Sequence, residues 1–159
     1  MVQAITVLAI VFLVVIDQAV KLLVLKNLSP VGSYILIDKF ISLTFVKNTG
    51  AAFGSFSGYT VVLSIITALV LIVGLIYLLS GKIKSKAVYI LAVMIISGGL
   101  ANLIDRVFRG YVVDYIEPLF IDFAVFNFAD MLVTVGSFII VIYLIVDLIK
   151  DTNREKKDK

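Results

Sequence analysis

The sequence predicts an α-helical integral membrane protein with four transmembrane helices and a small sheet outside the membrane. Of its 159 residues, 62% are hydrophobic and only 16% are charged, and the mean hydropathy is +1.15. Residues 60–79 are 20 consecutive residues without a charged side chain. A chain of this size cannot bury so much apolar surface in water, so the composition excludes an ordinary soluble enzyme.

The four predicted helices follow from four apolar runs. The first covers residues 4–16 and continues past Asp17 and Lys21 to about residue 25. No basic residue precedes it and no small-residue cleavage site follows it, so we expect a retained helix and not a cleaved signal peptide. The other runs cover residues 60–79, 87–104 and 131–146, and the 20-residue run matches the ~30 Å hydrocarbon core at ~1.5 Å per residue.

Basic residues predict the orientation and the domain boundaries. Eight of them lie between the second and third helices or after the fourth, whereas five are spread over the two longer segments on the other side. We therefore expect both termini in the cytoplasm. Residues 1–150 should form a single four-helix membrane domain with outer segments at about 26–59 and 106–129. Residues 151–159 should be a disordered, charged cytoplasmic tail.

The outer segments contain patterns of their own. Residues 41–45 alternate between apolar and hydroxyl side chains, and a shorter apolar run at 34–37 precedes them, which predicts a small sheet or hairpin. Residues 48–54, with glycine at two positions, favour a tight and closely packed backbone. The apolar stretch at 111–116 is expected to lie on the membrane surface.

The residue types that are missing restrict the chemistry. The chain has no cysteine and no histidine. This excludes a disulfide framework and thiolate chemistry, and it removes the commonest metal ligand and general base. The net charge of +3 is too small for a nucleic-acid binder. Any catalysis must therefore use carboxylates, hydroxyls, lysine or the backbone.

Asp114 and Asp130 are the candidate catalytic residues. Asp114 is embedded in an apolar stretch and Asp130 opens the fourth helix, so both are expected near the outer interface. Two close carboxylates cannot both ionise, so one keeps a proton while the other can activate water. Each also has a simpler explanation, since Asp114 could be a solvated loop residue and Asp130 a favourable anion at a helix N-terminus.

Other polar residues could support such a pair. Asn102 and Arg106 are four residues apart and share a helix face, and Asn127 lies three residues before Asp130. Arg106 could neutralise a carboxylate, bind an anionic headgroup, or simply extend to the interface. Asp17 and Lys21 have the spacing of an ion pair, and a merely tolerated buried pair is as consistent with it as an active role.

Five motifs occur in order across the four predicted helices: Asp17-Gln18, Asn48-Thr49-Gly50-Ala51-Ala52-Phe53-Gly54, Asn102-Leu103-Ile104-Asp105-Arg106, Val112-Val113-Asp114 and Phe126-Asn127-Phe128-Ala129-Asp130. Together they resemble lipoprotein signal peptidase, the bacterial signal peptidase II family, over nearly the whole chain except the tail. One departure is Ala101, where the family usually has glycine. Its methyl group could loosen a close contact, but it touches no residue that would carry the chemistry.

The resemblance implies an intramembrane aspartic endopeptidase of the bacterial cytoplasmic membrane, with an extracytoplasmic β-cradle, a short amphipathic segment over the site and the active site at the outer interface. The implied reaction cleaves prolipoproteins before a diacylglyceryl-modified cysteine and releases the signal peptide. The partners are these precursors and membrane lipids, no metal or organic cofactor is needed, and a monomer is expected. The implied catalytic dyad is Asp114 and Asp130, and the implied supporting residues are Asp17, Asn48, Asn102, Arg106 and Asn127.

Two other classes remain as alternatives. In a small transporter or ion carrier, Asp17, Lys21, Asp105 and Asp130 would form a proton or cation path. Polar residues do not continue into the inner halves of the helices to complete such a path. In a structural or accessory membrane subunit, neither Asp114 nor Asp130 would matter for activity.

Overall fold

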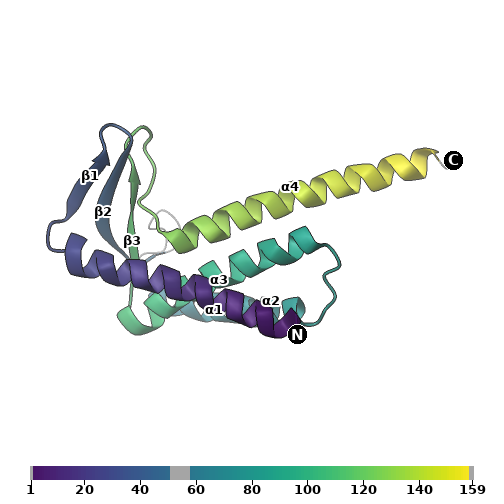
Figure 1. Ribbon diagram of the computed structural model, residues 1–159, viewed down its shortest axis with the longest axis horizontal. Helices are drawn as coiled ribbons and strands as arrows, with labels where there is room; N and C mark the ends of the chain where they lie inside the picture. The colour runs from purple at the N-terminus through teal and green to yellow at the C-terminus, as the bar shows by residue number, and fades with distance from the viewer. Residues whose placement is uncertain (1, 51–57, 158–159) are drawn as a thin grey trace.

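The computed structural model describes residues 2–50 and 58–157, and its described elements are helices joined to one small sheet (Figure 1). The helices are α1 (Val2–Leu23), which a π-helical turn extends (Val24–Leu28), α2 (Thr60–Leu79), α3 (Lys86–Arg109) and α4 (Phe128–Lys157). The strands are β1 (Ser33–Ile37), β2 (Ile41–Asn48) and β3 (Val112–Pro118). The described residues contain four helices long and apolar enough to cross a membrane, which confirms the predicted fold class.

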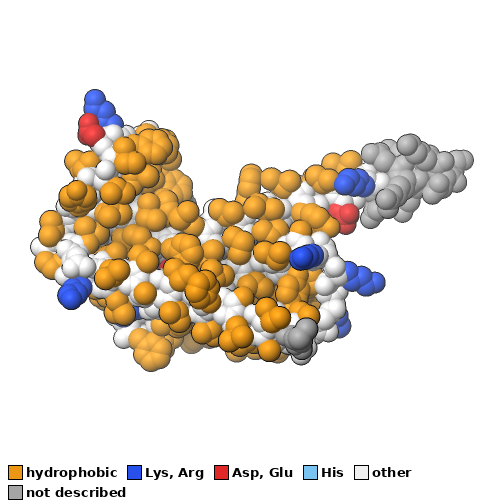
Figure 2. All heavy atoms as spheres, in the orientation of Figure 1, with side chains coloured by type: hydrophobic (Ala, Val, Ile, Leu, Met, Phe, Trp, Pro, Cys, Tyr) orange, Lys and Arg blue, Asp and Glu red, His pale blue; other side chains and the backbone are white. Residues whose placement is uncertain are grey.

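The sheet and the chain ends lie at opposite ends of the molecule. In Figure 1, the sheet rises beside the end of α1 and the start of α4. The N-terminus, the C-terminus and the α2–α3 connection lie toward the other end. Hydrophobic side chains cover most of the visible face over the helices and the sheet (Figure 2). A surface of this kind suits lipid contact, because water would not solvate it.

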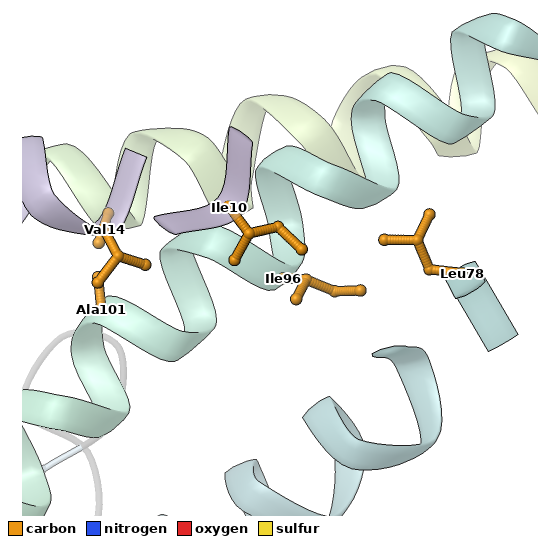
Figure 3. Packing of buried hydrophobic residues seen from close by; sticks show 6 residues of the cluster. Ile10, Val14, Leu78, Ile96 and Ala101 are labelled. Carbon is orange, nitrogen blue, oxygen red and sulfur yellow. The ribbon is translucent and has the colours of Figure 1, made fainter. Parts of the chain in front are cut away.

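Helix α3 packs against all three other helices and is the centre of the bundle. Figure 3 shows the buried contacts, in which Ile10 and Val14 of α1 lie near Ile96 and Ala101 of α3, with Leu78 of α2 beside them. Close approach of α3 to α4 depends on Gly98, because an added Cβ there would meet the first turns of α4. The start of α4 is therefore fixed against α3.

The sheet is antiparallel with strand order β1-β2-β3. Its first two strands confirm the hairpin predicted from residues 34–45. The third strand corrects the expectation that residues 111–116 lie on the membrane surface, because Val112 to Tyr115 are buried and β3 pairs with β2. Backbone groups in this stretch gain hydrogen bonds to β2 that a surface segment would have to make with water.

Two helix ends differ from the sequence expectation. Helix α3 continues through Arg109 and ends where Gly110 adopts a left-handed conformation with φ of 78°, so residues 106–109, the start of the predicted outer segment, belong to the helix. Helix α4 continues to Lys157, so the prediction of a disordered tail was wrong for residues 151–157. Extending a formed helix costs little, and the Lys, Arg and Glu of this tail are good helix formers.

Candidate active site

Asp114 and Asp130 come from different elements and line the same cavity. Asp114 lies on β3 and is 1% exposed, while Asp130 is half-buried in the first turn of α4. The cavity has a volume of about 490 Å³ and both carboxylates lie in its wall. The solvated-loop explanation for Asp114 therefore does not hold.

A single asparagine connects the two carboxylates. The Asn127 side-chain amide donates to Asp114 Oδ1 at 2.6 Å, and the Asn127 side-chain oxygen accepts from the backbone N–H of Asp130 at 2.9 Å. The backbone N–H of Asn127 donates in turn to Asp130 Oδ2 at 3.1 Å. These last two bonds form a reciprocal capping box at the start of α4. Asp130 is thus a favourable anion at a helix N-terminus, as in the simpler explanation from the sequence, and its carboxylate also lines the cavity.

The first two backbone N–H groups of α4, those of Phe128 and Ala129, donate to side chains of other elements. The Phe128 N–H donates to the Tyr115 hydroxyl at 3.3 Å, and the Ala129 N–H donates to Asp17 Oδ1 at 3.0 Å. The first N–H groups of a helix have no partner within the helix, so such acceptors fix where it begins. Residues of α1 and β3 therefore set the position of the turn that carries Asp130.

In each of the two carboxylates, the oxygen that Asn127 does not contact accepts a hydrogen bond from another asparagine. Asn48 of β2 donates to Asp114 Oδ2 at 2.9 Å, and Asn102 of α3 donates to Asp130 Oδ1 at 2.7 Å. The amide orientation of Asn102 is fixed because its oxygen accepts from Lys21 Nζ at 2.8 Å. The reversed amide would bring an NH₂ group against the lysine ammonium, so Lys21 keeps the Asn102 donor directed at Asp130.

Lys21 is part of a buried ionic network beneath the two carboxylates. Its ammonium lies 2.9 Å from Asp17 and 2.9 Å from Asp105, and all three side chains are 0% exposed. Asp105 also pairs with Arg109 and accepts the backbone N–H of Val113 at 3.1 Å. The network therefore joins α1, α3 and β3, and the predicted Asp17–Lys21 pair has partners on two further elements.

Arg106 reaches into the cavity from α3. Its guanidinium donates to the Gly50 carbonyl at 3.0 Å, so it connects α3 to the segment after β2. Among the described residues, its Nε is a buried donor with no hydrogen-bond partner. A buried donor of this kind is costly unless a ligand satisfies it, which points to an acceptor in the cavity.

The buried surroundings of the site raise the pKa values of two neighbouring side chains on β3, Asp114 and Tyr115. Burial, together with the nearby Asp130 charge, raises the pKa of Asp114 to about 6, against the opposing hydrogen bonds from Asn48 and Asn127. Burial also raises the pKa of Tyr115 to about 12. Asp114 can therefore carry a proton near neutral pH, while the Tyr115 hydroxyl stays neutral.

The cavity extends from the sheet toward the middle of the membrane-spanning helices. Thr67 of α2 and Val135 of α4 lie in its wall together with Asn48 and Asp114. The cavity follows α4 from Asp130 to Val135, five residues apart, so it extends about 7.5 Å along the helix at ~1.5 Å per residue. In the part of the chain that the structure describes, no three acidic side chains form a group able to hold a metal ion.

The structure brings together the dyad and the five supporting residues expected from the sequence. Asn48, Asn102 and Arg106 line the cavity, while Asn127 and Asp17 bind the start of α4. Residues 51–54 of the predicted tight segment lie outside the described residues. Sequence reasoning missed Tyr115 as a contact of α4 and Asp105 as a contact of β3. The presence of Asp105 at the end of an apolar run was the available signal for the second.

Comparisons with known proteins agree on one family. A family model described as signal peptidase (SPase) II matches residues 9–146. A lipoprotein signal peptidase of Clostridium acetobutylicum is 40% identical over 147 residues, covering 91% of this chain and 94% of the relative. One from Caldanaerobacter subterraneus subsp. tengcongensis is 44% identical over 132 residues, covering 81% of this chain and 88% of the relative.

The fold is also found among solved structures. A bacterial membrane enzyme determined by the in meso method at 2.3 Å resolution matches with a TM-score of 0.78 and 34% sequence identity. The match covers 94% of this chain and 90% of that chain. The similarity therefore includes the sheet and the helices, and it does not favour the transporter alternative.

Proposed function

The chain belongs to the signal peptidase II family, and we propose that it removes signal peptides from bacterial prolipoproteins as an intramembrane aspartic endopeptidase. The observation that carries this proposal is that Asn127 contacts both carboxylates of one cavity, Asp114 through its side chain and Asp130 through its backbone N–H. Asp114 and Asp130 are the proposed catalytic dyad.

The proposed reaction uses the dyad with one shared proton. The ionised carboxylate takes a proton from a water molecule, whose oxygen attacks the carbonyl carbon of the scissile peptide bond. The protonated carboxyl group donates its proton to the carbonyl oxygen. When the tetrahedral intermediate collapses and the C–N bond breaks, the amine receives the proton that the first carboxylate took from water, and the second carboxylate takes its proton back from the intermediate's hydroxyl group. Asn48 donates to Asp114 and Asn102 donates to Asp130, so each carboxylate keeps its orientation while protons are exchanged. Arg106 Nε would donate to a backbone carbonyl of the bound substrate.

The proposed substrate is a precursor cleaved just before a diacylglyceryl-modified cysteine. Asp130 lies at the sheet end of a membrane-spanning helix, which supports a site at the outer interface. Two acyl chains would hold the scissile bond at that depth, since each buried methylene contributes ~0.8 kcal/mol. The part of the cavity that extends along α2 and α4 would accept the end of the signal-peptide helix.

The proposed arrangement in the membrane follows from the charge distribution. Both termini and the α2–α3 connection would face the cytoplasm, where basic residues gather. Residues 1–150 would act as a single membrane domain with a charged segment after them. A monomer suffices for the proposed reaction, because one chain supplies both carboxylates and the five supporting residues.

The test is cleavage of a lipidated precursor by purified protein in a bilayer. Asp114→Asn and Asp130→Asn should each abolish signal-peptide release while the protein still inserts and folds, because neither carboxyl group alone completes the proton exchange. Asp147→Asn, in the inner half of α4, should keep near-normal activity. The same precursor without lipid should remain essentially uncut. Activity of Asp114→Asn close to that of the control would overturn the dyad assignment, and equal cleavage of both precursors would overturn the role of the lipid.

A further inference from the structure

Tyr115 follows Asp114 on β3, and its side chain connects three elements. It is 6% exposed and belongs to a buried cluster with Val24 and Leu28 from the π-helical turn after α1. Its hydroxyl oxygen accepts the N–H of Phe128, the first residue of α4, at 3.3 Å. The ring is thus anchored beneath the sheet while the hydroxyl contacts the helix that carries Asp130.

Two bonds join the β3 strand to the start of α4 at neighbouring positions. Asn127 donates to Asp114 at 2.6 Å, and Phe128 donates to Tyr115 at 3.3 Å. The same turn is also held by the bond from the Ala129 N–H to Asp17, and backbone bonds of Phe126 join β3 to the residues just before the helix. The Tyr115 bond adds a restraint between the first residue of α4 and the strand that carries Asp114, so the distance between the carboxylates depends on it as well.

We propose that Tyr115 is a positioning residue for the reaction: its hydroxyl holds the first turn of α4, and with it Asp130, at a fixed position relative to Asp114. This inference rests on the proposed peptidase function. Catalytic groups must keep their productive geometry closely, since a displacement of about 1 Å can cost on the order of 100-fold in rate. In the part of the chain that the structure describes, the Tyr115 hydroxyl bonds to the Phe128 N–H and to neither carboxylate, so it acts through the helix.

The chemistry of the hydroxyl supports this role over the whole working pH range. Burial, with the negative charges of Asp17, Asp130 and Asp114 nearby, raises the pKa of Tyr115 to about 12. The acceptor therefore stays neutral, and its contribution should not depend on pH. Removing it would lower the rate by the same factor at every pH and would leave the shape of the pH profile unchanged.

The test compares Tyr115→Phe with Tyr89→Phe. The Tyr89 hydroxyl bonds to the Thr6 hydroxyl at 2.6 Å and joins α1 to α3, far along the helix from Asn102 and Arg106. Both substitutions remove one hydroxyl contact and keep the ring, so each should lower the melting temperature slightly and by a similar amount. Only Tyr115→Phe should lower kcat for the lipidated precursor, by roughly 10-fold, with KM within about twofold.

The outcomes separate this inference from the proposed function. A wild-type protein that fails to cleave the lipidated precursor would overturn both. Wild-type cleavage with equal kcat in Tyr115→Phe and Tyr89→Phe would overturn the positioning role alone. A loss in Tyr115→Phe that only follows the fraction of unfolded protein, or that appears in KM and not in kcat, would also overturn it. A selective loss of kcat in folded Tyr115→Phe, constant with pH, would support it.

Discussion

Gly98→Ala should damage activity more than stability, because it displaces the turn that carries Asp130. An added Cβ would lie 2.9 Å from a methyl group of Val133 and 3.1 Å from Leu132 Cβ, and it would also contact the Ala129 carbonyl oxygen. Carbon atoms pack at about 3.5–4.0 Å, so the helices must separate locally by about half an ångström. The Ala129 oxygen and Leu132 Cβ move only with the backbone of α4, so no side-chain rotation relieves the overlap.

The expected magnitudes follow from two opposing effects. Overpacking of this kind costs about 1–3 kcal/mol, and alanine recovers about 1 kcal/mol of helix propensity over glycine. The net loss of stability should therefore be at most about 2 kcal/mol. The same shift moves Asp130 relative to Asp114, which should lower kcat by roughly 10- to 100-fold. Thermal unfolding in detergent and cleavage of a lipidated precursor measure the two effects separately.

Two matched glycines serve as controls. A Cβ at Gly136 would lie 2.8 Å from Ile95 Cγ1 and 3.3 Å from the Leu91 carbonyl oxygen, so it crowds the same pair of helices. It is six residues beyond Asp130, or about 9 Å along α4. A Cβ at Gly74 would make only an ordinary contact of 3.7 Å with Ile96. Gly136→Ala should lose stability and keep most activity, and Gly74→Ala should lose neither. Equal activity in the alanine variants at 98 and 136 would refute the displacement argument.

Three further predictions concern acidity, charge and orientation. Because the raised pKa of Asp114 is about 6, loss of the shared proton above that pH should lower kcat/KM by about tenfold per pH unit, and a flat profile from pH 6 to 9 would contradict this. Lys21→Met should destabilise the protein by about 3–5 kcal/mol, and adding Asp17→Asn should restore part of the loss, as thermal unfolding of the double variant would show. A cysteine at position 84 should resist an impermeant thiol reagent in intact cells, whereas one at position 47 should react; the reverse result would invert the proposed topology.

The parts of the fold and site that could be predicted from the sequence depend on local spacing. Apolar runs of helical length predict the membrane spans, and alternation predicts the β1–β2 hairpin. The same holds for Asp17 with Lys21, four residues apart, and for Asn127 with Asp130, three residues apart. In each case the relevant partners lie within about one helical turn, so their contact follows from helix geometry alone.

The parts that could not be predicted depend on contacts between distant segments. Asn48 and Asp114 are 66 residues apart, and their contact requires the pairing of β2 with β3. A short apolar stretch such as 111–116 gives no sign of which strand it will join. The orientation of the Asn102 amide is set by Lys21, 81 residues away, and by Asn127 and Asp130, because two donors contact the amide oxygen and a carboxylate accepts from its nitrogen. Neither the pairing of β2 with β3 nor the orientation of the Asn102 amide can be predicted from composition or periodicity.

The charges around the site explain why a single shared proton suits it. Beneath the dyad, the two carboxylates of Asp17 and Asp105 face the two cations Lys21 and Arg109, so this network is neutral as a whole. Arg106 is the remaining cation that interacts electrostatically with both Asp114 and Asp130. With one proton, the dyad has a single negative charge, which that guanidinium balances. With no proton it has an uncompensated charge in a buried cavity, and with two protons it leaves the guanidinium uncompensated. Burying a net charge is expensive, so the singly protonated state required for the proposed hydrolysis is also the state that leaves this group of residues neutral.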